Sequence, residues 1–93
     1  MRRIAALPTF QRSLKKLSPL EKAQLEESLD QFKAFVYRRV VPSGFGFKKL
    51  DQDIYEFRVG LRLRVLVLAE EDIYYLVLIG SHDEVNRYLR RIR

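Results

Sequence analysis

The segment "YEFRVGLRLRVLV", residues 55–67, constrains the fold more than any other part of the sequence. Apolar and polar side chains alternate on both sides of its central glycine, which is typical of two antiparallel strands joined by a short turn. A shift of one residue would mix the apolar and polar faces, so the register is restricted. The sequence therefore predicts a hairpin in which Val59 pairs with Leu63 and Phe57 with Val65.

The same register places Arg58 directly opposite Arg64, with residues 60–62 as the loop. Their β-carbons would be about 5 Å apart, and like charges at that separation destabilise a strand pair. Either a neighbouring carboxylate or a bound anion has to compensate. Glu56, on the same face, is the candidate carboxylate, and an anion bound by both arginines is the alternative.

Size and composition limit the remaining possibilities. Ninety-three residues, of which 47% are hydrophobic and 32% charged, predict a single globular domain covering residues 1–93. No apolar run approaches the ~20 residues that span a membrane, and the apolar patch near the N-terminus is too short for a secretory signal. We therefore expect a cytoplasmic protein with no membrane partner. Cysteine is absent and histidine occurs once, so no metal site and no cofactor are predicted.

Periodicity along the chain predicts an α+β domain with the element order β-α-α-β-β-β-α. The expected elements are a strand at 3–7, a helical hairpin at 9–36, a loop at 40–47, strands at 48–59, 61–69 and 73–79, and a helix after 81. Thr9 is a candidate cap for the first helix. Ser18 with Glu21, and Ser81 with Glu84, have the spacing of capping boxes. We expect the helices to pack on a small, mainly antiparallel sheet.

Charge and the single histidine provide the first indication of function. The net charge of +6 favours a polyanionic partner such as nucleic acid. If Ser81 caps the last helix, His82 lies in its first turn, where the helix dipole and free amides favour a phosphate. A histidine beside a phosphate can donate or accept a proton, whereas the simpler interpretation is a surface residue at a helix end. We expect His82, the arginine pair, Lys48 and Lys49 to face one concave surface.

These features together resemble the RelE/ParE superfamily of toxins from bacterial type II toxin–antitoxin systems. "FQRSLKKLSP" is similar to the opening helix of that family, and "KKLDQDIYEFRVGLRLRVLVL" to its Lys-Leu, Tyr-x-x-Arg-x-Gly and Arg-Val-Leu core. "IGSHDEVNRYLRR" is similar to its ending, in which a strand runs into a glycine, a basic residue or histidine, and the last helix. The resemblance covers nearly all of the chain.

The resemblance implies a metal-independent endonuclease that cleaves mRNA in the ribosomal A site. In this reaction the ribose 2′-hydroxyl attacks the adjacent phosphorus. The implied catalytic residues are Arg64, which stabilises the transition state, Arg58, which contacts the RNA, and His82, which serves as acid or phosphate ligand. The remaining residues expected to bind RNA are Lys48, Lys49, Arg62, Asn86 and Arg90.

The sequence departs from the family pattern at two positions. Asn86 stands where many active relatives have a tyrosine, and Gly46 lies near the position of a glutamate base in some relatives. Lys49, Asp51 and Asp53 are the alternative candidates for the base.

Partners and competing functions also follow from the resemblance. The implied partner is an acidic, partly disordered antitoxin that covers the basic surface and forms a hetero-oligomer with the toxin. One alternative function is that of a ParE-like toxin that poisons gyrase. Another is a catalytically inactive relative that only binds antitoxin or RNA. Whether arrested cells first lose protein synthesis or DNA synthesis distinguishes the first alternative from mRNA cleavage.

Overall fold

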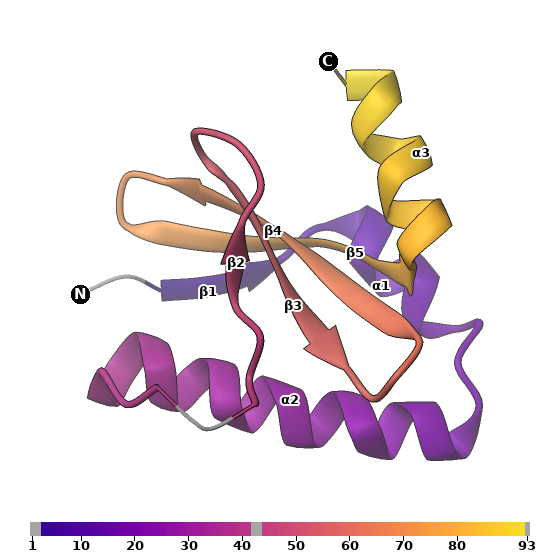
Figure 1. Cartoon of the computed structure of the whole chain (residues 1–93), viewed down its shortest axis with the longest axis horizontal. Coiled ribbons are helices and arrows are strands. Elements are labelled where there is room, and N and C mark those ends of the chain that lie inside the picture. The colour runs from indigo at the N-terminus through magenta and orange to yellow at the C-terminus, as the bar shows by residue number, and fades with distance from the viewer. Residues whose placement is uncertain (1–2, 42–43, 93) are drawn as a thin grey trace.

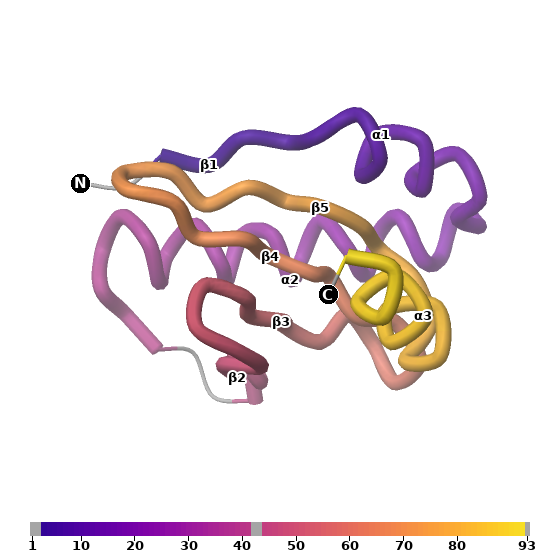
Figure 2. The backbone as a smooth tube through the Cα atoms, turned by 90° about the horizontal axis from the view of Figure 1, so that it is seen from above, coloured from indigo at the N-terminus to yellow at the C-terminus, as the bar shows by residue number. Residues whose placement is uncertain are grey.

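The computed structural model describes residues 3–41 and 44–92, which form a five-stranded sheet with helices packed against it (Figure 1). The elements are β1 (Arg3–Ala6), α1 (Pro8–Leu14), α2 (Pro19–Arg38), β2 (Lys48–Lys49), β3 (Ile54–Val59), β4 (Leu63–Glu70), β5 (Ile73–Ser81) and α3 (His82–Ile92). The strand order is β1-β5-β4-β3-β2, which Figure 2 shows from one edge to the other. Only β1 pairs in parallel, with β5. The predicted α+β class is confirmed.

The hairpin of β3 and β4 has the predicted register. Val59 pairs with Leu63, Phe57 with Val65, and Arg58 with Arg64. Residues 60–62 form the loop, with Gly60 at a φ of 60°, which a glycine adopts without steric cost. The alternation of apolar side chains was therefore sufficient to fix this pairing.

The prediction of one strand over residues 48–59 is wrong, because this segment forms two strands. The chain turns at 50–53, and β2 pairs back onto β3, with Lys48 opposite Glu56. The Leu50 amide donates to the Ile54 carbonyl at 2.7 Å, which closes the turn. Asp51 stabilises the turn by accepting a hydrogen bond from the Gln52 amide, a typical role of aspartate in turns. The predicted loop at 40–47 lies partly outside the described residues.

The helix starts differ in how they are capped. The capping box of Ser18 and Glu21 is present at the start of α2, as predicted. The prediction that Thr9 caps the first helix is wrong: α1 starts at Pro8, and the Thr9 hydroxyl donates to the Val77 carbonyl. Proline at the first helical position needs no amide partner. The hydrogen bond from the Thr9 hydroxyl instead links α1 to β5.

Two cores lie on opposite faces of the sheet. The larger core, on the α2 face, is built around Phe32, whose side chain is completely buried and packs against Phe57 with ring centroids 4.9 Å apart. The other aromatic rings next to Phe32 belong to Phe35, Phe45, Phe47 and Tyr74. The smaller core, on the α3 face, consists of Leu66, Val77, Val85 and Leu89. None of the helices in the described residues has the length and apolar composition of a membrane span.

Candidate functional site

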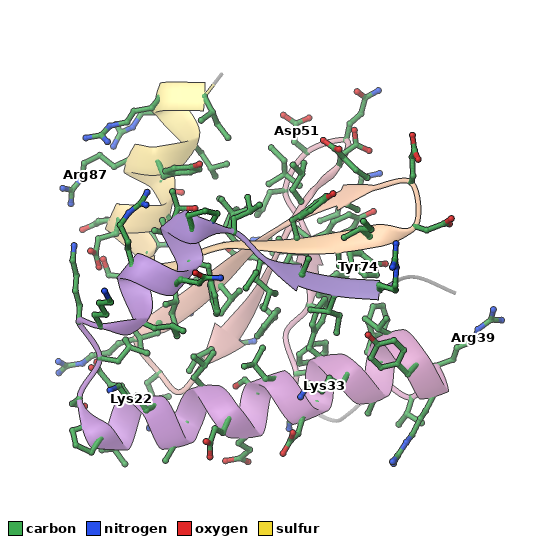
Figure 3. The ribbon with its side chains drawn as sticks, turned by 180° about the vertical axis from the view of Figure 1, so that it is seen from behind. Lys22, Lys33, Arg39, Asp51, Tyr74 and Arg87 are labelled. Atoms are coloured by element: carbon green, nitrogen blue, oxygen red, sulfur yellow. The ribbon has the colours of Figure 1, made fainter. Side chains whose placement is uncertain are left out.

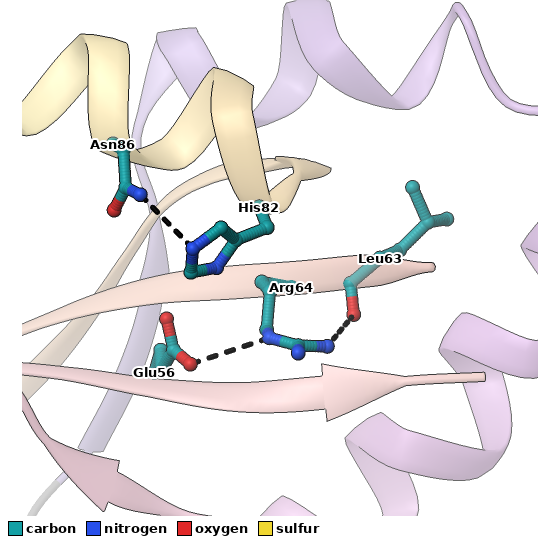
Figure 4. A network of polar contacts seen from close by, with 5 residues as sticks. All are labelled: Glu56, Leu63, Arg64, His82 and Asn86. Carbon is teal, nitrogen blue, oxygen red and sulfur yellow. Dashed lines mark hydrogen bonds and ion pairs between the residues drawn. The ribbon is translucent and has the colours of Figure 1, made fainter. Parts of the chain in front are cut away.

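A cluster of polar side chains lies on the α3 face, beside the smaller core. Leu66 of β4 packs under α3, whereas Glu56 and Arg64, whose side chains project from the same face, form a cluster with His82 and Asn86 of α3. Figure 4 shows His82 and Asn86 of α3 next to β4, with the His82 ring in contact with Asn86 and the Arg64 side chain in contact with Glu56. The polar groups lie beside this core, on a face that also carries partly buried apolar residues.

Glu56 and Arg64 form an ion pair across the β3–β4 hairpin. Arg64 Nε lies 3.3 Å from Glu56 Oε2, and the two side chains are only 22% and 12% exposed. Arg64 Nη1 also donates to the Leu63 carbonyl at 3.4 Å. A charge-assisted bond at a partly buried position is stronger than one in water, so Glu56 is the carboxylate that compensates the charge of Arg64.

His82 is the first residue of α3, because β5 runs directly into the helix. Ser81, the last residue of β5, pairs with Leu63, and the residue before it pairs with Arg64. Ser81 and Glu84 form the predicted capping box: the Ser81 amide donates to Glu84 Oε1 at 2.8 Å, and the Glu84 amide donates to Ser81 Oγ at 3.2 Å. The box therefore fixes the position of His82 beside the arginine.

The capping box also affects the ionisation of Glu84. The hydrogen bond from the Ser81 amide lowers the pKa of the Glu84 carboxyl, with smaller contributions from the Ser81 hydroxyl, Lys16 and Arg87, while partial burial opposes them. The folded protein thus favours the charged form of Glu84, and this charge is also well placed at the positive end of the helix dipole.

Asn86, one helical turn after His82, contacts the imidazole ring of His82. Asn86 Nδ2 lies 3.1 Å from His82 Nε2, the arrangement that i and i+4 residues allow. When Nδ2 donates, Nε2 carries the lone pair and the ring proton is on Nδ1. When the amide is turned over, Oδ1 accepts from a protonated Nε2. Asn86 can therefore orient the ring in both protonation states.

The Arg58 side chain takes a different direction from the one expected. Its backbone lies opposite Arg64 as predicted, but its guanidinium lies against Gly46, where an added β-carbon would be 2.8 Å from Nε. It lines a groove with residues of α2. The Arg58 guanidinium is thus placed beside Gly46 and not in the ion pair of Glu56 and Arg64, and the expected role of Arg58 in contacting RNA stays a prediction.

The expected RNA-binding residues are distributed around the cluster. Lys48 pairs directly with Glu56 and so projects on the same face of the sheet, whereas Lys49 pairs with Tyr55 and projects on the opposite face. Arg62 is exposed in the β3–β4 loop, and Arg90 is exposed on α3. His82, Asn86 and Arg90 follow one another at intervals of four residues and form one row along the helix.

The structure also indicates a different candidate base from those that the sequence suggested. Lys49 projects on the far face, and Asp51 and Asp53 belong to the turn between β2 and β3, where Figure 3 shows Asp51. Glu56 is the carboxylate that lies beside Arg64. Glu56 stands two residues before Arg58, so strand alternation alone predicts that its side chain projects on this face, as that of a charge partner or of a base.

Comparison with solved structures identifies the architecture. A copper-bound L66S mutant toxin from Helicobacter pylori has a TM-score of 0.70 at 19% identity, covering 91% of this chain and 99% of that chain. RelE from Methanococcus jannaschii, solved in complex with the antitoxin RelB, has a TM-score of 0.70 at 14% identity, covering 90% and 96%. The chain has the RelE toxin fold.

YafQ from Escherichia coli is also similar to this RelE-like chain, with a TM-score of 0.64 at 11% identity, covering 91% of this chain and 98% of YafQ. Neither a protein-family model nor a curated protein sequence matches the chain, so the similarity is one of structure. Within residues 3–41 and 44–92, no group of three histidine, cysteine or acidic side chains is placed to hold a metal ion.

Proposed function

We propose that this RelE-like chain is the toxin of a type II toxin–antitoxin system and that it cleaves mRNA in the ribosomal A site. The observation that carries the proposal is the cluster of His82, Arg64 and Glu56, which combines a proton carrier, a cation and a carboxylate on the open part of the α3 face. The similar solved structures include toxins bound to their antitoxins, which supports the toxin role. The net charge of +6 suits an RNA substrate.

The reaction follows from the arrangement of these groups. The Glu56 carboxylate removes the proton of the ribose 2′-hydroxyl, and the 2′-oxygen forms a bond to the adjacent phosphorus. Arg64 stabilises the additional negative charge on the phosphorane oxygens. His82, in its protonated form, donates a proton to the 5′-oxygen as the phosphorus–oxygen bond breaks. The products are a 2′,3′-cyclic phosphate and a 5′-hydroxyl.

Neighbouring residues bind and orient the substrate. Lys48 on the sheet and Arg90 on α3 flank the cluster and neutralise RNA phosphates. Asn86 is a positioning residue that acts through the His82 ring. The same basic surface would be covered in the inactive complex by an acidic segment of an antitoxin, which gives a hetero-oligomer.

The proposal is tested with an mRNA positioned on purified bacterial ribosomes and the same mRNA free in solution. The ribosome-bound mRNA should be cut in the A-site codon, leaving a 2′,3′-cyclic phosphate, and the free mRNA should be cut far more slowly. Replacing the ribose at the cut by a 2′-deoxyribose should abolish cleavage, because the nucleophile is removed. Cleavage that persists at the deoxyribose, or no cleavage by a folded protein, would contradict the proposal.

A further inference from the structure

A groove of about 350 Å³ lies between α2 and the β3–β4 hairpin, separate from the histidine cluster. Its lining residues are Gln24, Glu27, Ser28 and Gln31 of α2, Gly44, and Arg58, Gly60 and Leu61 of the hairpin. Figure 1 shows the hairpin loop lying over α2. The volume is within the range of small-ligand sites, about 300 to 1,000 Å³.

Two glycines shape this groove by leaving space for polar side chains. Gly60 and Gly46 have positive φ angles of 60° and 69°. A β-carbon at Gly60 would lie 2.8 Å from Gln24 Oε1, and a β-carbon at Gly46 would lie 2.8 Å from Arg58 Nε. Gln24 and Arg58, which both line the groove, therefore pack against glycine backbone that a larger residue would obstruct.

The chemistry of the lining suits a planar polar ring better than an isolated phosphate. Glutamine amides donate and accept hydrogen bonds, and Ser28, only 7% exposed, adds a hydroxyl. The Glu27 carboxylate opposes a phosphate or an acidic peptide in the groove, but it accepts hydrogen bonds from a base. Leu61, 96% exposed at the tip of the hairpin, offers an apolar surface on which a base can pack.

Guanine is the best complement to this set of groups. Its N1–H and N2–H donors form a pair that one carboxylate can accept, and its O6 and N7 acceptors form a pair that one guanidinium can donate to. Glu27 and Arg58 supply these two groups. Unpaired bases are also what proteins read in single-stranded RNA.

Arg58 connects the groove to the proposed site of cleavage. Its backbone lies opposite Arg64 in the β-ladder, while its guanidinium reaches the groove. An RNA strand whose scissile phosphate lies at Arg64 would pass Arg58. The exposed side chain of Arg62 could then contact the next phosphate of that strand. Resting on the proposed function, we infer that this groove binds an unpaired base, preferably guanine, that flanks the cut in the RNA substrate.

The inference is tested by NMR titration of the protein with 2′-O-methyl RNA hexanucleotides, which bind but cannot be cleaved. Four oligonucleotides carry G, A, C or U at one position in a uridine background. The guanine oligonucleotide should bind most tightly and shift the side-chain amide signals of Gln24 and Gln31. Glu27→Gln should weaken its binding about tenfold, the usual value of one bidentate base contact. Glu26→Gln, on the same helix but outside the groove, is the matched control and should bind as the wild type does.

Because this titration requires no cleavage, it separates failure of the inference from failure of the proposed function. Glutamine signals that do not move with any oligonucleotide, or equal binding of all four bases, overturn the inference even when ribosome-bound mRNA is cut. Guanine-dependent shifts that Glu27→Gln weakens support the groove as a base site even if no mRNA is cleaved, and only the proposed function then fails.

Discussion

The two faces of the sheet differ in what their side chains do. The α2 face is filled by aromatic rings around Phe32, and none of the described side chains buried on this face is charged. The α3 face has a small aliphatic core under the helix and, beside it, the ion pair of Glu56 and Arg64 with His82. Both faces belong to the same strands, because successive residues of a strand project to opposite sides.

Under the proposed function, this division separates stability from chemistry. Large rings bury much apolar surface, so the α2 face supplies most of the hydrophobic stabilisation. The α3 face can then keep partly buried charged groups without loss of the fold. Substitutions in the aromatic core of the α2 face should therefore mainly lower stability, whereas substitutions in the polar cluster of the α3 face should mainly lower activity.

The largest effect on stability is expected for Phe32→Ala. Removing the completely buried ring leaves a cavity between α2 and the sheet, which should lower the free energy of unfolding by about 3–5 kcal/mol. Leu20→Ala, on the same helix but 68% exposed, should change it by less than about 0.5 kcal/mol. Urea denaturation measures both values. Similar losses for the two variants would show that the α2 face does not hold the fold.

Arg64→Met should affect both properties. The Glu56 carboxylate loses its partner at a partly buried position, which should cost about 1–3 kcal/mol of unfolding free energy. Cleavage should fall by about 100-fold or more, because the charge of the phosphorane is no longer stabilised. The double variant Arg64→Met with Glu56→Leu removes both charges, so it should recover most of the stability but none of the cleavage. Recovered cleavage would contradict the assigned roles.

Glu84→Gln should produce a smaller loss of stability that depends on pH. Since folding lowers the pKa of Glu84, its charge stabilises the native state above the ordinary pKa, and this contribution is lost as pH falls through the folded-state pKa. The difference in unfolding free energy from wild type should be less than about 1 kcal/mol near neutral pH and vanish in acid. Asp83→Asn, in the same turn but outside the capping box, is the control. A difference that persists in acid would exclude the proposed charge effect.

Asn86→Ala should have the smallest effect. Loss of one hydrogen bond to His82 should reduce cleavage roughly fivefold, which corresponds to about 1 kcal/mol, with unfolding free energy nearly unchanged. Because Asn86 acts through the imidazole, Asn86→Ala should cause no further loss of cleavage in a protein that already carries His82→Ala. Asn86→Gln should leave activity low if orientation of the ring matters, and an equal additional loss in the His82→Ala protein would show that Asn86 does not act through the ring.

Local patterns predicted those parts of the fold that depend on neighbours in sequence. Alternation fixed the pairing of Arg58 with Arg64, and spacing of three residues located the capping box at Ser81. The two-residue strand β2 is too short to have a pattern of its own, so the split at 50–53 was missed. Thr9 was assigned to a helix cap because its partner, the Val77 carbonyl, is 68 residues away.

The candidate site was predictable only in part for the same reason. The positions of Arg64 and His82 on adjacent strand ends follow from the order of elements. The path of the Arg58 side chain depends on Gly46. Gly46 lies outside the helices and strands, so no periodic pattern predicts this contact. Glu56 pairs directly with Lys48 on one side and Leu66 on the other, and its ion pair with Arg64 is diagonal across the hairpin. A sequence pattern alone does not tell which of these neighbours the carboxylate contacts.

The most direct test of the account is the single-turnover rate of cleavage of ribosome-bound mRNA by wild type, His82→Ala and Asp83→Ala. His82 and Asp83 are adjacent exposed residues in the first turn of α3, so the two substitutions should affect folding similarly. The account predicts a rate about 100-fold or more below wild type for His82→Ala and close to wild type for Asp83→Ala. Equal rates for all three proteins would make His82 a helix-end residue and contradict the assignment of chemistry to the α3 face.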